Sequence, residues 1–209
     1  MPGSSFDALE LDALKELMNL GFGRAAANLS ELMDLHVVLS VPRVELVPIE
    51  ELASYVANEV DDPKSFNVVE QFFLGNFEGT SFLLLPEEEG RRLVEMLAGG
   101  DTDSDNPLDS LESETIIEIG NIIIGACVSK VAELLGDVVT YLPPRFATGA
   151  LDRELLERYV QPGPGMALVL KTLFRFERRD VFGLLFLVTT DSGLAWLKRA
   201  VSSWLESLS

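Results

Sequence analysis

The 209-residue chain is poor in the residue types that several common functional sites require. Cysteine and histidine occur once each, and Lys and Arg number 16 against 34 Asp and Glu, a net charge of −18. A single cysteine excludes an intramolecular disulfide framework. A single histidine, His36, argues against histidine-based catalytic triads and multi-histidine metal sites. Nucleic acid is not an expected partner because a nucleic-acid binder needs a basic surface.

Long hydrophobic runs are also missing. The longest, Val181–Val188, is interrupted only by Gly183 and is far shorter than the roughly 20 residues of a membrane-spanning helix. Residues Met1–Asp7 lack the basic start and the apolar stretch of a signal peptide. We therefore expect a cytoplasmic protein without membrane insertion. Cys127 lies in an apolar run, so we expect a buried structural thiol rather than a reactive one.

Apolar residues recur at spacings of three and four over about 6–33 and again over about 109–135, which predicts two long amphipathic helices. An N-terminal capping signal at Ser4 and Asp7 precedes the first helix. Shorter helices are predicted at about 50–56, 86–98, within 149–165, and from Asp191, as its cap, to about 205. Strands are predicted at about 37–47 (an edge or bulged strand), 68–74, 80–85, a segment ending at Arg145, 166–176 and 181–188.

One pattern of residues occurs twice in the chain, at an offset of 102 residues. Glu16 and Asn19, followed by Pro42 and Arg43, recur as Glu118, Asn121, Pro144 and Arg145. This offset predicts an internal pseudo-two-fold duplication, with repeats at about 6–98 and 109–205 joined by a polar linker at 99–108. Neither half alternates strand and helix as a doubly wound fold does. We therefore expect one α+β domain over 1–209, with a mixed or antiparallel sheet covered by the two long helices.

Both long helices carry a polar face at the repeated pattern. Residues spaced like positions 12, 16, 19 and 23 lie within about 60° of one another on a helix. A glycine inside a helix costs roughly 1 kcal/mol relative to alanine, yet it leaves room for a partner to approach closely. The first stripe is Asp12, Glu16, Asn19 and Gly23, and the second stripe is Glu114, Glu118, Asn121 and Gly125. Each stripe is suited to inserting an amide and a carboxylate into the active site of another protein.

Other interpretations fit these residues less well. A single Glu-x-x-Asn usually marks a solvated helix face, and the copies of a duplication begin identical. The repeated residues nevertheless persist among positions that have diverged, such as Leu17-Met18 against Ile119-Gly120, and this favours function. Gly21–Ala26 matches a dinucleotide fingerprint, but that fingerprint follows a strand, whereas a helix precedes these glycines.

The repeated pattern of Glu, Asn and Pro resembles the CheC phosphatases of bacterial chemotaxis, and the resemblance runs from about residue 7 to 200. It implies hydrolysis of the aspartyl phosphate on a CheY-type response regulator. Asn19 and Asn121 would orient the attacking water, and Glu16 and Glu118 would pair with a lysine of the regulator. Mg²⁺ would belong to the regulator, so the chain is expected to need no cofactor or metal of its own. The resemblance also implies CheD as a further partner.

One position departs from the family pattern. The family usually has Asp or Ser four residues before the Glu, which Asp12 satisfies, whereas the second stripe has Glu114, with Ser113 one place away. This leaves open whether both sites are active. A non-catalytic adaptor that docks a receiver domain or CheD through the same helix faces, or a flagellar-switch component, is the alternative interpretation.

Overall fold

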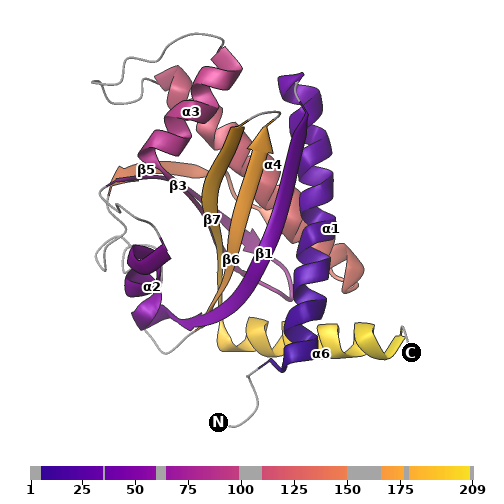
Figure 1. Cartoon of the computed structure of the whole chain (residues 1–209). Helices are drawn as coiled ribbons and strands as arrows, with labels where there is room; N and C mark the ends of the chain where they lie inside the picture. Colours follow the sequence, from indigo (N-terminus) through magenta and orange to yellow (C-terminus); the bar gives the residue numbers. More distant parts are fainter. Residues whose placement is uncertain are drawn as a thin grey trace.

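The computed structural model describes residues 6–34, 36–59, 65–98, 110–149, 166–176 and 179–207, and shows a sheet with long helices packed against it (Figure 1). The helices are α1 (Ala8–Met33), the short 3₁₀ turn η1 (Ile49–Glu51), α2 (Leu52–Glu59), α3 (Glu87–Ala98), α4 (Ser110–Leu134) and α6 (Asp191–Ser207). The strands are β1 (Val37–Pro48), β2 (Phe66–Leu74), β3 (Gly79–Pro86), β4 (Thr140–Tyr141), β5 (Arg145–Gly149), β6 (Met166–Phe176) and β7 (Arg179–Thr189).

The seven strands form one antiparallel sheet in the order β1-β6-β7-β3-β2, and β2 also pairs with both β4 and β5 at the far edge. The expected α+β fold with an antiparallel sheet is therefore confirmed. The first strand of each half pairs with the hairpin of the other half, β1 with β6 and β5 with β2. The ladder between β1 and β6 shifts register between Ser40 and Arg43, so the prediction of a bulged edge strand is also confirmed.

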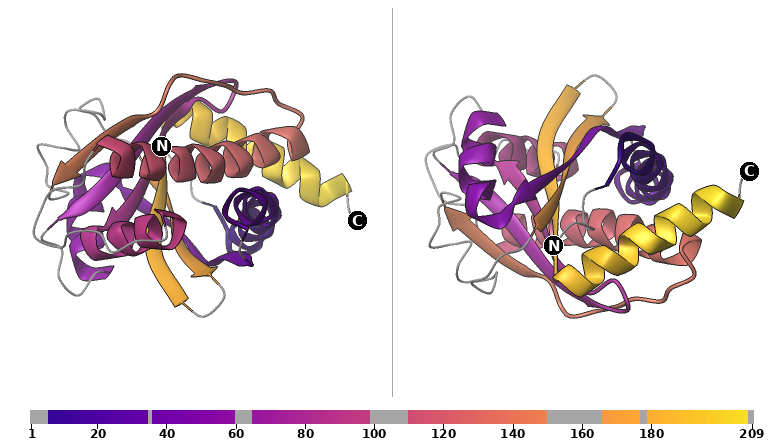
Figure 2. Two further views of the ribbon diagram at one scale, coloured as in Figure 1. Left: turned by 90° about the horizontal axis from the view of Figure 1, so that it is seen from above. Right: turned by 90° about the horizontal axis from the view of Figure 1, so that it is seen from below.

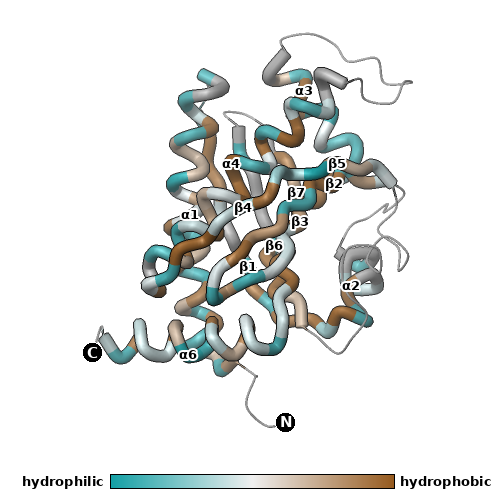
Figure 3. The backbone as a smooth tube through the Cα atoms, turned by 180° about the vertical axis from the view of Figure 1, so that it is seen from behind, coloured by the Kyte–Doolittle hydropathy of each residue, from teal (hydrophilic) through white to brown (hydrophobic). Residues whose placement is uncertain are grey.

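The main core lies between one face of the sheet and the helices α1, α3, α4 and α6. In Figure 2, α1 is seen end-on while α4 and α6 run across the view. Hydrophilic and hydrophobic residues both recur along the whole of α1 (Figure 3), and hydrophobic residues such as Leu14 and Phe22 pack in the core, as expected for an amphipathic helix. A second, smaller cluster on the opposite face of the sheet includes Leu52 of α2, with Tyr55 packed against it.

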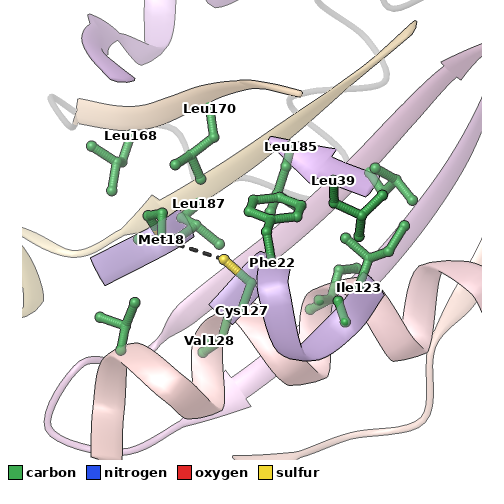
Figure 4. Packing of buried hydrophobic residues seen from close by; sticks show 14 of the residues in the cluster. Met18, Phe22, Leu39, Ile123, Cys127, Val128, Leu168, Leu170, Leu185 and Leu187 are labelled. Atoms are coloured by element: carbon green, nitrogen blue, oxygen red, sulfur yellow. Dashed lines mark hydrogen bonds between the residues drawn. The ribbon is translucent and has the colours of Figure 1, made fainter. Parts of the chain in front are cut away.

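Helices α1 and α4 cross closely at Gly21. A Cβ atom added to Gly21 would lie 2.8 Å from the Cα atom of Cys127, so the crossing leaves no room for a side chain there. The Cys127 thiol is fully buried and donates a hydrogen bond to the sulfur of Met18, at 3.3 Å (Figure 4). Burial raises the pKa of Cys127 to about 12. The expectation of a buried structural cysteine is confirmed.

One described segment, Ser113–Glu133 in α4, is long and apolar enough to pass a length-and-composition test for a membrane span, with a mean hydropathy of 1.6. Half of its tested window is buried inside the protein, where α4 packs against α1 and the sheet. The core helix of a soluble protein passes the same test.

Helix α1 begins with a capping box. The Asp7 carboxylate accepts from the Glu10 backbone N–H at 2.8 Å, and the Glu10 carboxylate accepts from the Asp7 N–H at 2.9 Å. Glu10 is 7% exposed and also accepts from the Ser202 hydroxyl of α6 at 2.7 Å, with Lys198 Nζ 3.6 Å away. The predicted cap at Asp7 is confirmed, and Ser4 lies outside the described residues. Glu10 also ties the start of α1 to α6.

Two local predictions were wrong. The cap of α6 is Thr190, whose hydroxyl accepts from the Gly193 N–H at 3.1 Å, whereas Asp191 is already the first helical residue. The strand expected to end at Arg145 instead begins there. Before it only β4 pairs with β2, because Pro143 and Pro144 have no N–H to donate to a ladder. The linker 99–108 and the segment 150–165 lie outside the described residues.

Candidate functional site

Each stripe lies on one face of its helix, where solvent reaches it. On α1 the side chains of Asp12 and Glu16 are exposed, Gly23 is exposed, and Asn19 is half-buried. On α4 the pattern repeats, with Glu114 and Glu118 exposed and Asn121 and Gly125 half-buried. In both helices the carboxylates therefore project into solvent, and the Asn amide lies closer to the rest of the protein. None of the eight predicted residues is buried in the core.

The two stripe glycines differ from the packing glycines of the same helices. A Cβ atom added to Gly23 or Gly125 would meet nothing within 4 Å. By contrast, a Cβ atom on Gly21 would meet the α4 backbone, and one on Gly120 would lie 2.7 Å from a methyl carbon of Val69. Packing within the described part of the chain thus explains Gly21 and Gly120. It does not explain Gly23 and Gly125, which leave the helix surface open beside each Asn.

The Asn121 amide of the second stripe is held by a residue that the sequence analysis missed. The Gln71 side-chain nitrogen, on β2, donates to Asn121 Oδ1 at 3.0 Å and to the Leu142 carbonyl at 3.3 Å. Gln71 is 3% exposed. Its position in β2 beside the apolar pair Phe72 and Phe73 was the signal in the sequence, since a buried amide needs partners.

A second polar contact supports the same stripe at its glycine. The Tyr141 hydroxyl, on β4, donates to the Gly125 carbonyl at 3.2 Å and shares a hydrogen bond with the Ser129 hydroxyl at 2.8 Å. Burial raises the pKa of Tyr141 to about 12, partly opposed by the hydrogen bond with Ser129. The phenol is therefore neutral near pH 7 and keeps its proton for the Gly125 carbonyl.

The repeated Pro-Arg elements meet different charges across the sheet. Arg145 lies opposite Glu70 in the β5–β2 ladder. Burial raises the pKa of Glu70, and the nearby Arg145 charge partly offsets that effect. Arg43 lies opposite Lys171 in the β1–β6 ladder and pairs with Glu45 of its own strand at 3.2 Å. These arginines belong to the sheet edges rather than to the stripes.

The stripe carboxylates have no side-chain partners in the described ranges. Glu16 and Glu118 make no hydrogen bond or ion pair with the residues that the structure places, so both can pair with a cation from outside. Leu20 and Leu142 add exposed apolar surface beside the first and second Asn, at 52% and 49% exposure. Within the same ranges, no group of three or more His, Cys, Asp or Glu side chains could hold a metal ion.

An open groove in the described part of the chain lies elsewhere. It encloses about 840 Å³ between β1, η1–α2 and the start of α1, and no stripe residue lines it. Both stripes are instead on convex helix surfaces. An amide and a carboxylate displayed in this way cannot enclose a small molecule, but they can enter a cleft on another protein.

The fold is shared with a solved structure. The structure matches the crystal structure of FliY from Thermotoga maritima with a TM-score of 0.77, covering 95% of this chain and 98% of that one at 18% identity. At that identity the match shows a shared fold. In sequence, residues 9–46 match the CheC-like family, and the resemblance to CheC proteins is thereby confirmed.

Two curated relatives extend the sequence match beyond that segment. The CheY-P phosphatase CheC of Bacillus subtilis (strain 168) is 28% identical over 130 residues, 60% of this chain and 59% of that protein. The flagellar motor switch phosphatase FliY of the same organism is 22% identical over 138 residues, 66% of this chain and 35% of that protein. The match thus spans about a third of FliY and about three fifths of CheC.

Proposed function

We propose that this protein removes the phosphoryl group from the aspartyl phosphate of a CheY-type receiver domain. The observation that carries the proposal is the paired stripe, an exposed Glu one turn from a half-buried Asn, present on both long helices. Similarity to a CheY-P phosphatase supports the choice of substrate. The setting is bacterial chemotaxis or a related two-component pathway in the cytoplasm, and CheD is a proposed additional partner.

In this mechanism the chain supplies position rather than covalent chemistry. Phosphoryl transfer depends mainly on placing the nucleophile in line and on stabilising charge. Asn19 or Asn121 would hold the attacking water, because an amide can donate and accept hydrogen bonds without titrating. Glu16 or Glu118 would pair with a lysine of the receiver and so set the docking register. Mg²⁺ bound to the receiver would neutralise charge on the phosphoryl oxygens.

The decisive experiment measures phosphate release from a Mg²⁺-bound phosphorylated receiver. We expect the wild type to accelerate release, and Asn19→Ala combined with Asn121→Ala to remove the acceleration, about 100-fold or more if the amides position the water. Circular dichroism checks that the double variant is folded, which is expected because neither Asn lies in the core. Full activity in the double variant would show that the stripes are not catalytic.

A non-catalytic role in the flagellar switch is the second candidate. The sequence similarity to a flagellar motor switch protein favours the switch setting, and binding without hydrolysis is the alternative within it. The same helix faces would then bind a receiver domain without hydrolysing its phosphate. The assay above separates the two, because an adaptor would bind the phosphorylated receiver and leave its lifetime unchanged.

A further inference from the structure

We propose that Gln71 is the positioning residue of the second stripe, fixing the Asn121 amide with its oxygen toward the sheet and its NH₂ group toward the docking partner. The inference rests on the proposed function and deepens it. It gives a role to a residue of β2 that belongs to neither stripe.

The backbone sets the direction of this hydrogen-bond chain. The Leu142 carbonyl can only accept, so the atom of Gln71 that reaches it, at 3.3 Å, must be the side-chain nitrogen. That nitrogen carries a second hydrogen, which goes to Asn121 at 3.0 Å. Asn121 must therefore present its oxygen to Gln71. Rotating the Gln71 amide by half a turn would set two carbonyl oxygens against each other and lose both bonds.

Gln71 is itself firmly placed. It is 3% exposed and lies opposite Ser81 in the β2–β3 ladder, while the Leu142 N–H donates to the Phe72 carbonyl at 2.9 Å. The oxygen of Gln71 is buried without a hydrogen-bond partner among the described residues. Such an atom costs about 1–3 kcal/mol. An apolar side chain would avoid that cost, so packing alone does not account for an amide at this position.

Gly120 allows α4 to come within reach of Gln71. A Cβ atom there would lie 2.7 Å from Val69, two residues before Gln71 on β2. The corresponding position of α1 is Met18, whose side chain is fully buried between α1 and the sheet. The close glycine contact that brings the helix within reach of β2 therefore belongs to the second stripe.

The fixed orientation has a chemical consequence. With one lone pair of Oδ1 bound to Gln71, Asn121 offers its N–H groups to a water at the receiver, and the rotation of the amide is already restricted. Preorganisation of this kind lowers the barrier to reaction, whereas docking depends on the exposed helix faces, to which the buried Gln71 adds almost no surface. Loss of Gln71 should thus reduce the maximal rate and leave the half-saturating receiver concentration unchanged.

The test isolates each stripe before changing Gln71. In an Asn19→Ala background only the second stripe can act, and there Gln71→Leu should reduce the maximal dephosphorylation rate about 10- to 100-fold. In an Asn121→Ala background the same Gln71→Leu change should leave the rate of the first stripe unaltered. Equal losses in both backgrounds, or a change in half-saturation alone, would overturn the positioning role.

A second measurement on the wild type does not depend on activity or on the folding of a variant. In ¹⁵N NMR spectra the side-chain NH₂ protons of Gln71 should exchange slowly with solvent, and those of Asn121 rapidly. The reverse order would overturn the proposed orientation. If no variant or wild type releases phosphate while the NMR order holds, the proposed function fails and the orientation stands.

Discussion

Helices α1 and α4 present matching residues on their outward faces, whereas the residues that support each helix from beneath differ. Outward, both carry two acidic residues, an Asn and an open glycine at matching spacing. Inward, the buried Met18 and Leu39 of the first half correspond to Gly120 and Tyr141 of the second. The first support is therefore apolar at these positions, while the second adds hydrogen bonds to the helix it carries. The comparison teaches that the surface presented to a partner and the packing beneath it can change independently.

The largest expected effect concerns the helix crossing, where Cys127 takes the place that Ala25 has in α1. Burial raises the pKa of this thiol to about 12 from a model-compound value of 9.0, so at pH 8 the native thiolate fraction falls about 1,000-fold. We expect a disulfide reagent to label the native protein at least that much more slowly than the chain in urea. The labelling rate of the native protein should rise with pH as the Cys127 thiol ionises, and the raised pKa moves this rise to higher pH than in the unfolded chain. Equal rates would show that α1 and α4 separate readily.

The next effect compares the two glycines of α4 that differ in contact. Gly120→Ala should destabilise the protein by about 1–3 kcal/mol, because the added methyl group presses against Val69 and forces α4 off β2. Gly125→Ala adds the same group where nothing lies within 4 Å and serves as the matched control. Urea unfolding measures both. If the two variants are equally stable, α4 does not depend on close contact with the sheet.

The smallest expected effect tests whether Gly23 and Gly125 leave space for the receiver domain to bind. Gly23→Ala and Gly125→Ala should each stabilise the protein by roughly 1 kcal/mol, since alanine is the better helix former and meets no obstacle. Each change should also weaken binding of the phosphorylated receiver, because the methyl group occupies the approach to the adjacent Asn. Binding is measured by titration beside the urea unfolding curve. Variants that gain stability and bind equally well would remove the functional reason for these glycines.

Features set by local sequence were predictable, and features set by tertiary contact were not. Helical periodicity placed all eight stripe residues on outward faces, and the capping box at Asp7 and Glu10 follows from residues three apart. The contacts of Gln71 join positions 50 and 71 residues away in the chain, which no local pattern reports. The strand break at Pro143 and Pro144 was readable, since neither residue can donate to a ladder. The duplication and its boundaries stay a prediction.

The pairing of β1 with β6 bears on how the chain reaches this structure during synthesis. Val37 meets Phe176 at one end of the ladder and Pro48 meets Met166 at the other, so the partner strand is translated more than a hundred residues later. Until then β1 leaves the ribosome with its backbone groups unpaired, and closing so long a loop is slow. Most of the polypeptide must be made before the edge of the sheet can form. A nascent chain stalled before β6 would expose β1 with unpaired backbone N–H and C=O groups, which favour aggregation. Such a chain would depend on a chaperone to remain unaggregated.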